Sequence, residues 1–127
     1  MYTQNKTLQA ATVIAKTTQT LIGAEIDLDG ADYLTIFLAY TKGDETGLIL
    51  KPYFLPALGG TKSQVCDWAA TSGAYTGTAT SITFTASATK SFTWDVRGIS
   101  AFRLEAGGSN NDGTPTGTLA AKYTAKG

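Results

Sequence analysis

The nine-residue stretch Tyr33-Leu34-Thr35-Ile36-Phe37-Leu38-Ala39-Tyr40-Thr41 decides the fold class of this chain. Every second position from Leu34 to Tyr40 carries a large apolar side chain, and these positions are Leu34, Ile36, Leu38 and Tyr40. Side chains of a β-strand point alternately to opposite faces of a sheet, so a period of two is typical of a half-buried strand. The stretch therefore predicts a strand with one face in a core.

The same alternation recurs on both sides of this stretch, interrupted by turn residues such as Asp29-Gly30 and Lys42-Gly43-Asp44-Glu45. Threonine, with 22 copies, favours strands, and no window shows a capped helical stripe. Short alternating strands at this spacing are typical of a two-sheet antiparallel sandwich, either jelly-roll-like or immunoglobulin-like. The Cys-Trp-Cys spacing of true immunoglobulin domains is absent. We predict eight or nine strands, at residues 8–14, 20–28, 33–41, 48–55, 64–69, 80–85, 92–97, 100–106 and 118–124.

The length of 127 residues predicts one domain over residues 1–127, with residues 1–6 as a flexible arm. Ten basic residues balance ten acidic ones, and the absence of a basic stripe argues against nucleic acid as a partner. No apolar run approaches the roughly 20 residues that span a bilayer, and the N-terminus does not resemble a secretory signal. We therefore expect neither a nucleic-acid partner nor a membrane partner.

The chain contains no histidine, which removes catalytic triads, Cys-His dyads and most zinc sites. The adjacent carboxylates of Asp44 and Glu45 lie on a turn and would point apart, unlike the facing pair of a glycosidase. Aspartates 27, 29 and 32 surround a glycine turn, and residues 110–112 form a similar pattern. We read both as turn chemistry rather than calcium sites. The sequence predicts no enzyme activity, no cofactor and no metal.

Four single residues carry local predictions. Cys66 has no second cysteine to pair with and is expected to be a small buried side chain. Pro52 cannot donate a hydrogen bond to a neighbouring strand, which indicates a sheet edge or a bulge. Trp94 alternates with core positions and is expected in the core, which leaves Tyr75 as the better candidate for an exposed contact.

Two neighbouring segments are apolar on both faces. Tyr33 and Phe37 lie opposite the core face of their strand, and residues 49, 53 and 55 do the same in the next strand. Monomeric sandwiches normally alternate hydrophobic inside and polar outside, so either a loop such as residues 57–62 or another subunit must cover the second face. The predicted interaction face consists of Tyr33, Phe37, Ile49, Tyr53, Leu55 and Tyr75.

Two stretches carry a family resemblance. The first runs Ala31-Asp32-Tyr33-Leu34-Thr35-Ile36 and continues to Tyr40-Thr41-Lys42-Gly43-Asp44-Glu45-Thr46. The second is Arg103 followed by Gly113-Thr114-Pro115-Thr116-Gly117-Thr118-Leu119. Together they cover about a third of the chain and resemble small virion proteins of tailed bacteriophages. The resemblance implies a β-sandwich that is built into a phage particle or decorates it, and it names no catalytic residue.

The composition and the resemblance together lead to a non-enzymatic virion protein. The expected function is capsid decoration, in which a homo-oligomer binds the major capsid protein or other virion proteins and reinforces the shell by repeated contacts. Assembly would take place in the host cytoplasm, with the virion as the final location. Two alternatives stay open: a carbohydrate-binding module, and a head–tail connector or tail component.

Overall fold

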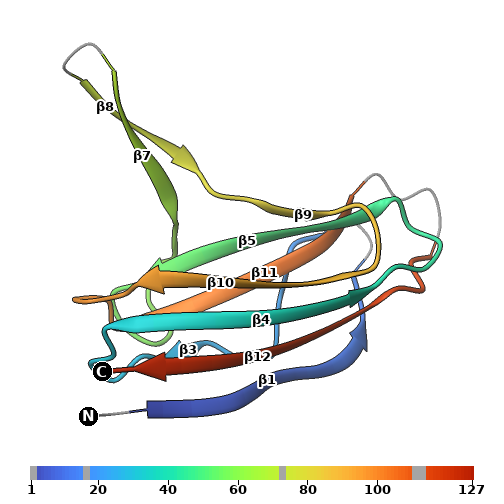
Figure 1. The fold of residues 1–127 in the computed structure, drawn as a ribbon, viewed down its shortest axis with the longest axis horizontal. Coiled ribbons are helices and arrows are strands. Elements are labelled where there is room, and N and C mark those ends of the chain that lie inside the picture. The colour runs from blue at the N-terminus through green and yellow to red at the C-terminus, as the bar shows by residue number, and fades with distance from the viewer. Residues whose placement is uncertain (1–2, 16–17, 72–73, 110–113) are drawn as a thin grey trace.

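The computed structural model describes residues 3–15, 18–71, 74–109 and 114–127. For residues 67–71, 74–78 and 109 it describes the backbone only. The described residues form strands and turns without a helix, and they assemble into two antiparallel sheets packed face to face (Figure 1). The predicted all-β sandwich is therefore confirmed. Among the described residues, no helix is long and apolar enough to cross a bilayer.

The two sheets, which we call sheet A and sheet B, contain ten strands among the described residues. In spatial order, sheet A comprises β1 (Thr3–Val13), β12 (Thr118–Lys126), β4 (Tyr33–Thr41) and β10 (Ala88–Asp95). At the centre of sheet B, β11 (Ala101–Ser109) pairs with β5 (Gly47–Leu55). On its other side, β11 pairs with the short strands β2 (Thr20–Leu21) and β3 (Ile26–Asp27). On its other side, β5 pairs with β6 (Ser63–Gln64) and β9 (Ile82–Phe84). Strands β7 (Cys66–Thr71) and β8 (Ala74–Ala79) pair with each other in a separate ribbon that extends away from the two sheets.

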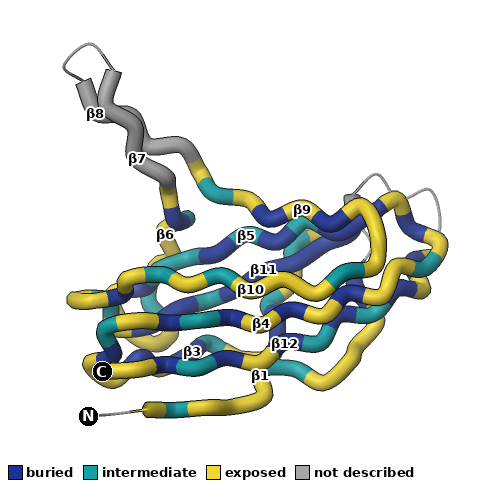
Figure 2. Tube along the Cα trace, in the orientation of Figure 1, coloured by how far each residue is buried: buried dark blue, intermediate teal, exposed yellow. Residues whose placement is uncertain are grey.

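The core lies between the sheets and has the face that the sequence predicts. Leu34, Ile36, Leu38 and Tyr40 are all buried, and the residues between them are not. Figure 2 shows this alternation of burial along β4. Sheet B meets them with Leu48, Leu50, Phe102 and Leu104. Trp94 is half-buried at the side of this core, 5.1 Å from the Phe102 ring, as its alternation indicates.

The strand predicted over residues 20–28 is broken into β2 and β3. Gly23 lies between them with a φ of +63°, a left-handed conformation that side chains rarely adopt. A Cβ added to Gly23 would also lie 2.0 Å from the carbonyl oxygen of Leu8. The chain bends there because β1 passes this close, which is one reason that the strand count exceeds the predicted eight or nine.

Two further sequence predictions are wrong because of strand pairing. Residues 3–6, predicted as a flexible arm, pair with Tyr123–Lys126 as the start of β1. Cys66 is exposed, because the neighbouring Val65 takes the buried position and donates its N–H to the carbonyl of Pro52, 3.0 Å away. In this segment Val65 points inward and Cys66 outward, so the alternation is shifted by one residue from the predicted arrangement.

Pro52 lies inside sheet B rather than at an edge. Its cross-strand neighbour on β11 is Leu104. The carbonyl of Leu104 points away from β5 and accepts a hydrogen bond from the N–H of Ile22. The Leu104–Pro52 pair is therefore a non-hydrogen-bonded pair, and the backbone of Pro52 faces the other side. On that side β9 pairs with residues up to Leu50 and β6 from Tyr53 onward. Pro52, which has no N–H to donate, therefore lies between the part of β5 that pairs with β9 and the part that pairs with β6.

The segment 42–46 does not form a hairpin turn within one sheet, because it carries the chain from β4 in sheet A to β5 in sheet B. The buried carboxylate of Glu45 fixes this crossing. Its Oε2 accepts from the Tyr40 hydroxyl and from the Gly43 N–H at 2.8 Å, and its Oε1 accepts from the Gly117 N–H at 2.8 Å. A Cβ at Gly117 would lie 2.1 Å from Oε2, so glycine is required for this approach. We call this contact the Glu45 latch.

The Glu45 latch predicts a loss of stability in acid. Burial raises the pKa of Glu45, but the hydrogen bonds from Tyr40, Gly43 and Gly117 outweigh it and lower the pKa to about 2. A carboxylate whose pKa is lower in the folded chain adds stability above its unfolded value of 4.5, and this stability is lost as the pH falls towards 2. We expect Glu45 to contribute about 3 kcal/mol to this acid loss. Denaturant unfolding of wild type and Glu45→Gln between about pH 7 and pH 2 measures it, and parallel pH profiles would contradict it.

Candidate interaction face

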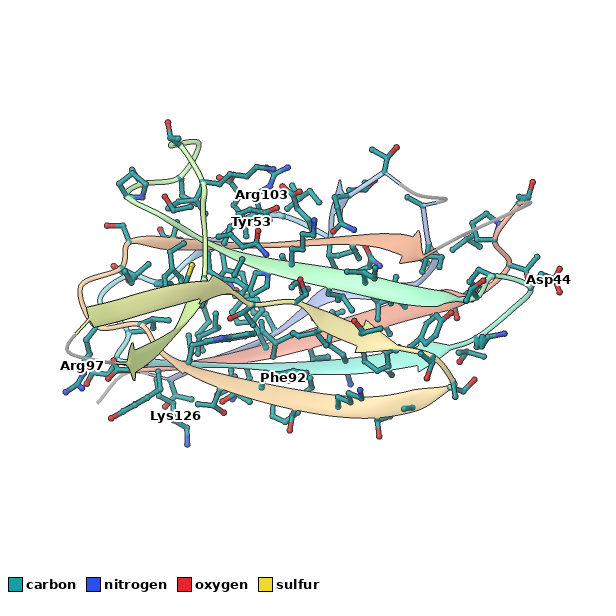
Figure 3. All side chains as sticks on the ribbon, turned by 90° about the horizontal axis from the view of Figure 1, so that it is seen from above. Asp44, Tyr53, Phe92, Arg97, Arg103 and Lys126 are labelled. Atoms are coloured by element: carbon teal, nitrogen blue, oxygen red, sulfur yellow. The ribbon has the colours of Figure 1, made fainter. Side chains whose placement is uncertain are left out.

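The outer surfaces of the two sheets differ, and that of sheet B is covered. Lys62, from the loop after β5, lies 4.6 Å from the centre of the Tyr53 ring and 2.5 Å from Oε2 of Glu105. Arg103 donates to the same oxygen at 2.6 Å and reaches Glu25 at 3.3 Å. Figure 3 shows Tyr53 and Arg103 on this side of the sandwich, away from Lys126 on the other side.

The Glu105 carboxylate is buried, although alternation predicts an outward position for it. Burial raises its pKa, but hydrogen bonds from Lys62 and Arg103 outweigh this and lower the pKa below its usual value. The Gly59 N–H donates to Glu25 at 2.7 Å, which fixes the loop on sheet B. The loop of residues 57–62, considered from the sequence as a cover for Phe37, therefore covers the opposite side of the molecule.

The outer surface of sheet A has no such cover within the described part of the chain. Tyr33 and Phe37 point outward from β4 and remain 47% and 48% exposed. The registers place Lys126 beside Tyr33 and Lys122 beside Phe37, with β10 on the other flank. We call this surface the Phe37 face, defined by the outward residues of β1, β12, β4 and β10.

One end of the Phe37 face is an apolar groove of about 570 Å³. Small side chains form its floor because Ala39 and Ala120 are cross-strand neighbours, and Phe37 forms one wall. It is also lined by Thr89, Lys90 and Ser91 of β10, by Lys122 of β12, and by Gln9 and Ala10 of β1. We call this the Phe37 groove. Its shape and apolar floor suit a protruding apolar side chain of another protein.

The other end of the face is a second hollow of about 570 Å³, lined mostly by hydroxyl and amide side chains. Asn5, Thr124, Thr35 and Thr93 stand side by side across β1, β12, β4 and β10. The hydroxyl oxygens of Thr35 and Thr93 lie 2.9 Å apart, and the Thr124 hydroxyl donates to Oδ1 of Asn5 at 2.6 Å. We call this row, with Tyr33 and Phe37 on either side of it, the threonine trough.

The face carries uncompensated positive charge. Lys122 and Lys126 form no ion pair within the described part of the chain. Asp95, at the Tyr33 end, is already held by Arg97 through hydrogen bonds of 2.9 and 3.1 Å from Nε, and these contacts lower the pKa of Asp95. The Arg97 guanidinium lies 6.0 Å from the Tyr33 ring centre and helps to hold that ring in place.

The structure brings together only part of the predicted interaction face. Tyr33 and Phe37 share the Phe37 face, whereas Ile49, Tyr53 and Leu55 lie in sheet B, and Leu55 is buried there. The side chain of Tyr75 lies outside the described residues. The sequence pattern does not reveal the hydroxyl row, because Thr35 and Thr93 are 58 residues apart and only the strand register makes them neighbours.

One of the two acidic turns, at residues 27–30, contains a side-chain-to-backbone hydrogen bond of the kind that is typical of turns. Oδ1 of Asp27 accepts from the N–H of Asp29 at 3.1 Å, and Asp29 has a positive φ of 45°. Within the described ranges, no group of three or more acidic or cysteine side chains is placed to hold a metal ion. Residues 110–112, the second predicted turn of this kind, lie outside the described residues.

The architecture places the chain among antiparallel two-sheet β-sandwich proteins. No protein-family model matches the chain, and no curated protein matches its sequence. Solved structures do share the fold. YomS, a protein derived from the SPBc2 prophage, has a TM-score of 0.59 at 16% identity, over 98% of this chain and 92% of YomS.

Two larger proteins contain the same fold. The PBSX exported protein XepA has a TM-score of 0.59 at 19% identity, over 98% of this chain and 37% of XepA. VP2 of infectious bursal disease virus, in its subviral particle, has a TM-score of 0.54 at 13% identity, over 98% of this chain and 32% of VP2. This chain thus spans about a third of each of them. At these identities the likeness is one of fold, and the fold of a prophage-derived protein agrees with the phage resemblance of the sequence.

Proposed function

We propose that this chain is a non-enzymatic structural protein of a phage particle, and specifically a decoration protein on the head surface. The observation that supports this most directly is the fold, which extends over nearly the whole length of both this chain and the prophage-derived YomS. The fold also occurs in VP2, which forms a subviral particle. Fold alone does not define function, so the proposal also depends on the Phe37 face.

We infer that the sandwich is a jelly roll. Counting β2 with β3 as one interrupted strand, and β6 with β9 as another, leaves two sheets of four strands. Their spatial orders are then first-eighth-third-sixth and second-seventh-fourth-fifth along the chain. This is the arrangement of two interlocked Greek keys, which is common in viral capsid domains.

The Phe37 groove is the contact that we assign to this function. Its floor of Ala39 and Ala120 leaves room for an apolar side chain, and Phe37 beside it can bury its exposed half on binding. Large aromatic side chains dominate interface energies, whereas exposed charges at the rim contribute little. The partner we propose is the major capsid protein or another virion protein, with further copies of this chain completing a homo-oligomer. Many weak copies on one shell would then reinforce it by avidity.

Electron microscopy of purified particles, with the chain carrying a density label, tests this proposal. We expect regular label over the head surface at sites where capsid subunits meet. Label confined to the neck or tail would overturn the decoration role and support the connector or tail alternative. Particles without any label, from cells in which the labelled chain is expressed and soluble, would overturn the virion role itself.

A further inference from the structure

We propose that the threonine trough is a binding site for an acidic oligosaccharide, meaning a glycan whose sugar units carry carboxylate, sulfate or phosphate groups. This inference is independent of the Phe37 groove and goes beyond the proposed virion role. The two sites are neighbouring hollows of the same face that share Phe37 at their boundary.

The aromatic rings at the two ends of the trough provide the first argument. Tyr33 and Phe37 are four residues apart on the same face of β4, which places them about 13 Å apart along the strand. Both rings are about half exposed. The C–H faces of a pyranose ring are apolar and pack well against an aromatic ring. Two such rings at this spacing suit separate sugar units of one chain rather than a single monosaccharide.

The polar row between the rings provides the second argument. When one hydroxyl of the Thr35–Thr93 pair donates to the other, the acceptor still has its own hydrogen to donate. Asn5 accepts from Thr124 through Oδ1 and keeps both hydrogens of its amide nitrogen. The row therefore offers donors and acceptors, already oriented by these hydrogen bonds, to a ligand that itself carries both.

The lysines decide the charge of the ligand. Lys126 lines the trough beside Tyr33, and Lys122 lies beside Phe37, where it lines the adjoining Phe37 groove. Neither has an acidic partner in the described chain, and the nearby Asp95 is neutralised by Arg97. An anionic ligand would pair with both ammonium groups, and an uncharged glycan would leave them unused.

The same features favour a glycan over a protein segment in this half of the face. The centres of protein interfaces are depleted in charged residues and in lysine in particular, and they are rich in apolar contacts. The trough instead has threonines and an asparagine at its centre, with Lys126 lining its Tyr33 end and Lys122 beside Phe37 at the boundary with the groove. The Phe37 groove is also lined by Lys90 and Lys122, but its alanine floor gives it the apolar centre that a protein contact prefers.

The test uses immobilised oligogalacturonates, heparin-derived oligosaccharides and glycerol-phosphate oligomers as acidic probes, with cello-oligosaccharides as neutral controls. We expect at least one acidic class to be retained, with binding that weakens as salt rises. Titration calorimetry should then show Tyr33→Ala lowering the affinity by up to about tenfold. Replacing both lysines, Lys122→Gln with Lys126→Gln, should lower it further and flatten the salt dependence.

Matched controls lie on the other side of the molecule. Leu58→Ala removes an exposed apolar side chain from the loop on sheet B, and Lys51→Gln removes a lysine from β5. Both should leave glycan binding unchanged, and circular dichroism should confirm that every variant is folded. Retention of none of the acidic probes overturns the proposal, and equal retention of cello-oligosaccharides overturns the acidic assignment.

The proposals for the groove and for the trough can be refuted independently of each other. Ala39→Glu, in the groove, should weaken particle binding and leave glycan binding intact, whereas Tyr33→Ala should do the reverse. If Tyr33→Ala weakens particle binding and leaves glycan binding unchanged, the trough is part of the protein contact and the glycan site is refuted. Loss of the virion role with retained glycan binding refutes only the proposed function.

Discussion

Replacement of Phe37 with aspartate should abolish the association of this chain with its virion partner while the chain itself stays folded. The side chain is 48% exposed on the outer surface of sheet A, so an aspartate there stays in contact with water in the free protein. In the complex, the same carboxylate would be buried against an apolar partner surface, with Lys122 as the neighbouring cation on β12. By the scale of interface hot spots, we expect a loss of about 2–4 kcal/mol, which is roughly a 30- to 700-fold weaker association.

Folding should survive because the other face of β4 is untouched. Leu34, Ile36 and Leu38 remain in the core, and the register of β4 with β10 and β12 does not involve the Phe37 side chain. Light scattering and particle binding report the association, and thermal melting reports the fold. Leu58→Asp, at a similarly exposed apolar side chain in the loop that covers sheet B, is the matched control and should change neither. A folded Phe37→Asp chain that still binds particles would exclude the Phe37 groove as the contact.

Glu45→Ala should be among the most destabilising single substitutions in the chain. The carboxylate accepts from the Tyr40 hydroxyl and from the N–H groups of Gly43, Thr116 and Gly117, and the residue is 3% exposed. Removing it leaves the buried Tyr40 hydroxyl and the buried Gly117 N–H without an acceptor, and each such group costs about 1–3 kcal/mol. We expect a total loss of at least about 3 kcal/mol in the free energy of unfolding, measured by denaturant titration at neutral pH.

Two smaller changes separate the contributions to the Glu45 latch. Glu45→Gln keeps one acceptor oxygen but presents an amide nitrogen to the remaining donors, so it should fall between wild type and Glu45→Ala. Tyr40→Phe removes a single hydrogen bond and should cost less, about 1 kcal/mol, because three backbone donors still hold the carboxylate. If Glu45→Ala were as stable as wild type, the latch would not be what holds the crossing between the sheets.

The alternation of side chains was enough to predict the class of fold and much of the core. Where a strand has a clear period of two, as in residues 33–41 and 118–124, the buried and outward residues are those predicted. The reason is local, because successive side chains of a strand must point to opposite faces whichever strand lies beside it. The outward positions of Tyr33 and Phe37, and hence two residues of the candidate site, follow from the sequence in this way.

The identity of the neighbouring strand is a different matter, because only the tertiary structure decides it. A period of two does not say whether β4 and β5 share a sheet, and the buried Glu45 sends them into different ones. Tyr53 thereby receives the cover of Lys62, whereas Phe37 stays open. The row from Asn5 to Thr93 likewise joins residues from four strands. Such contacts depend on pairing between distant segments, and the pattern within each segment carries no record of that pairing.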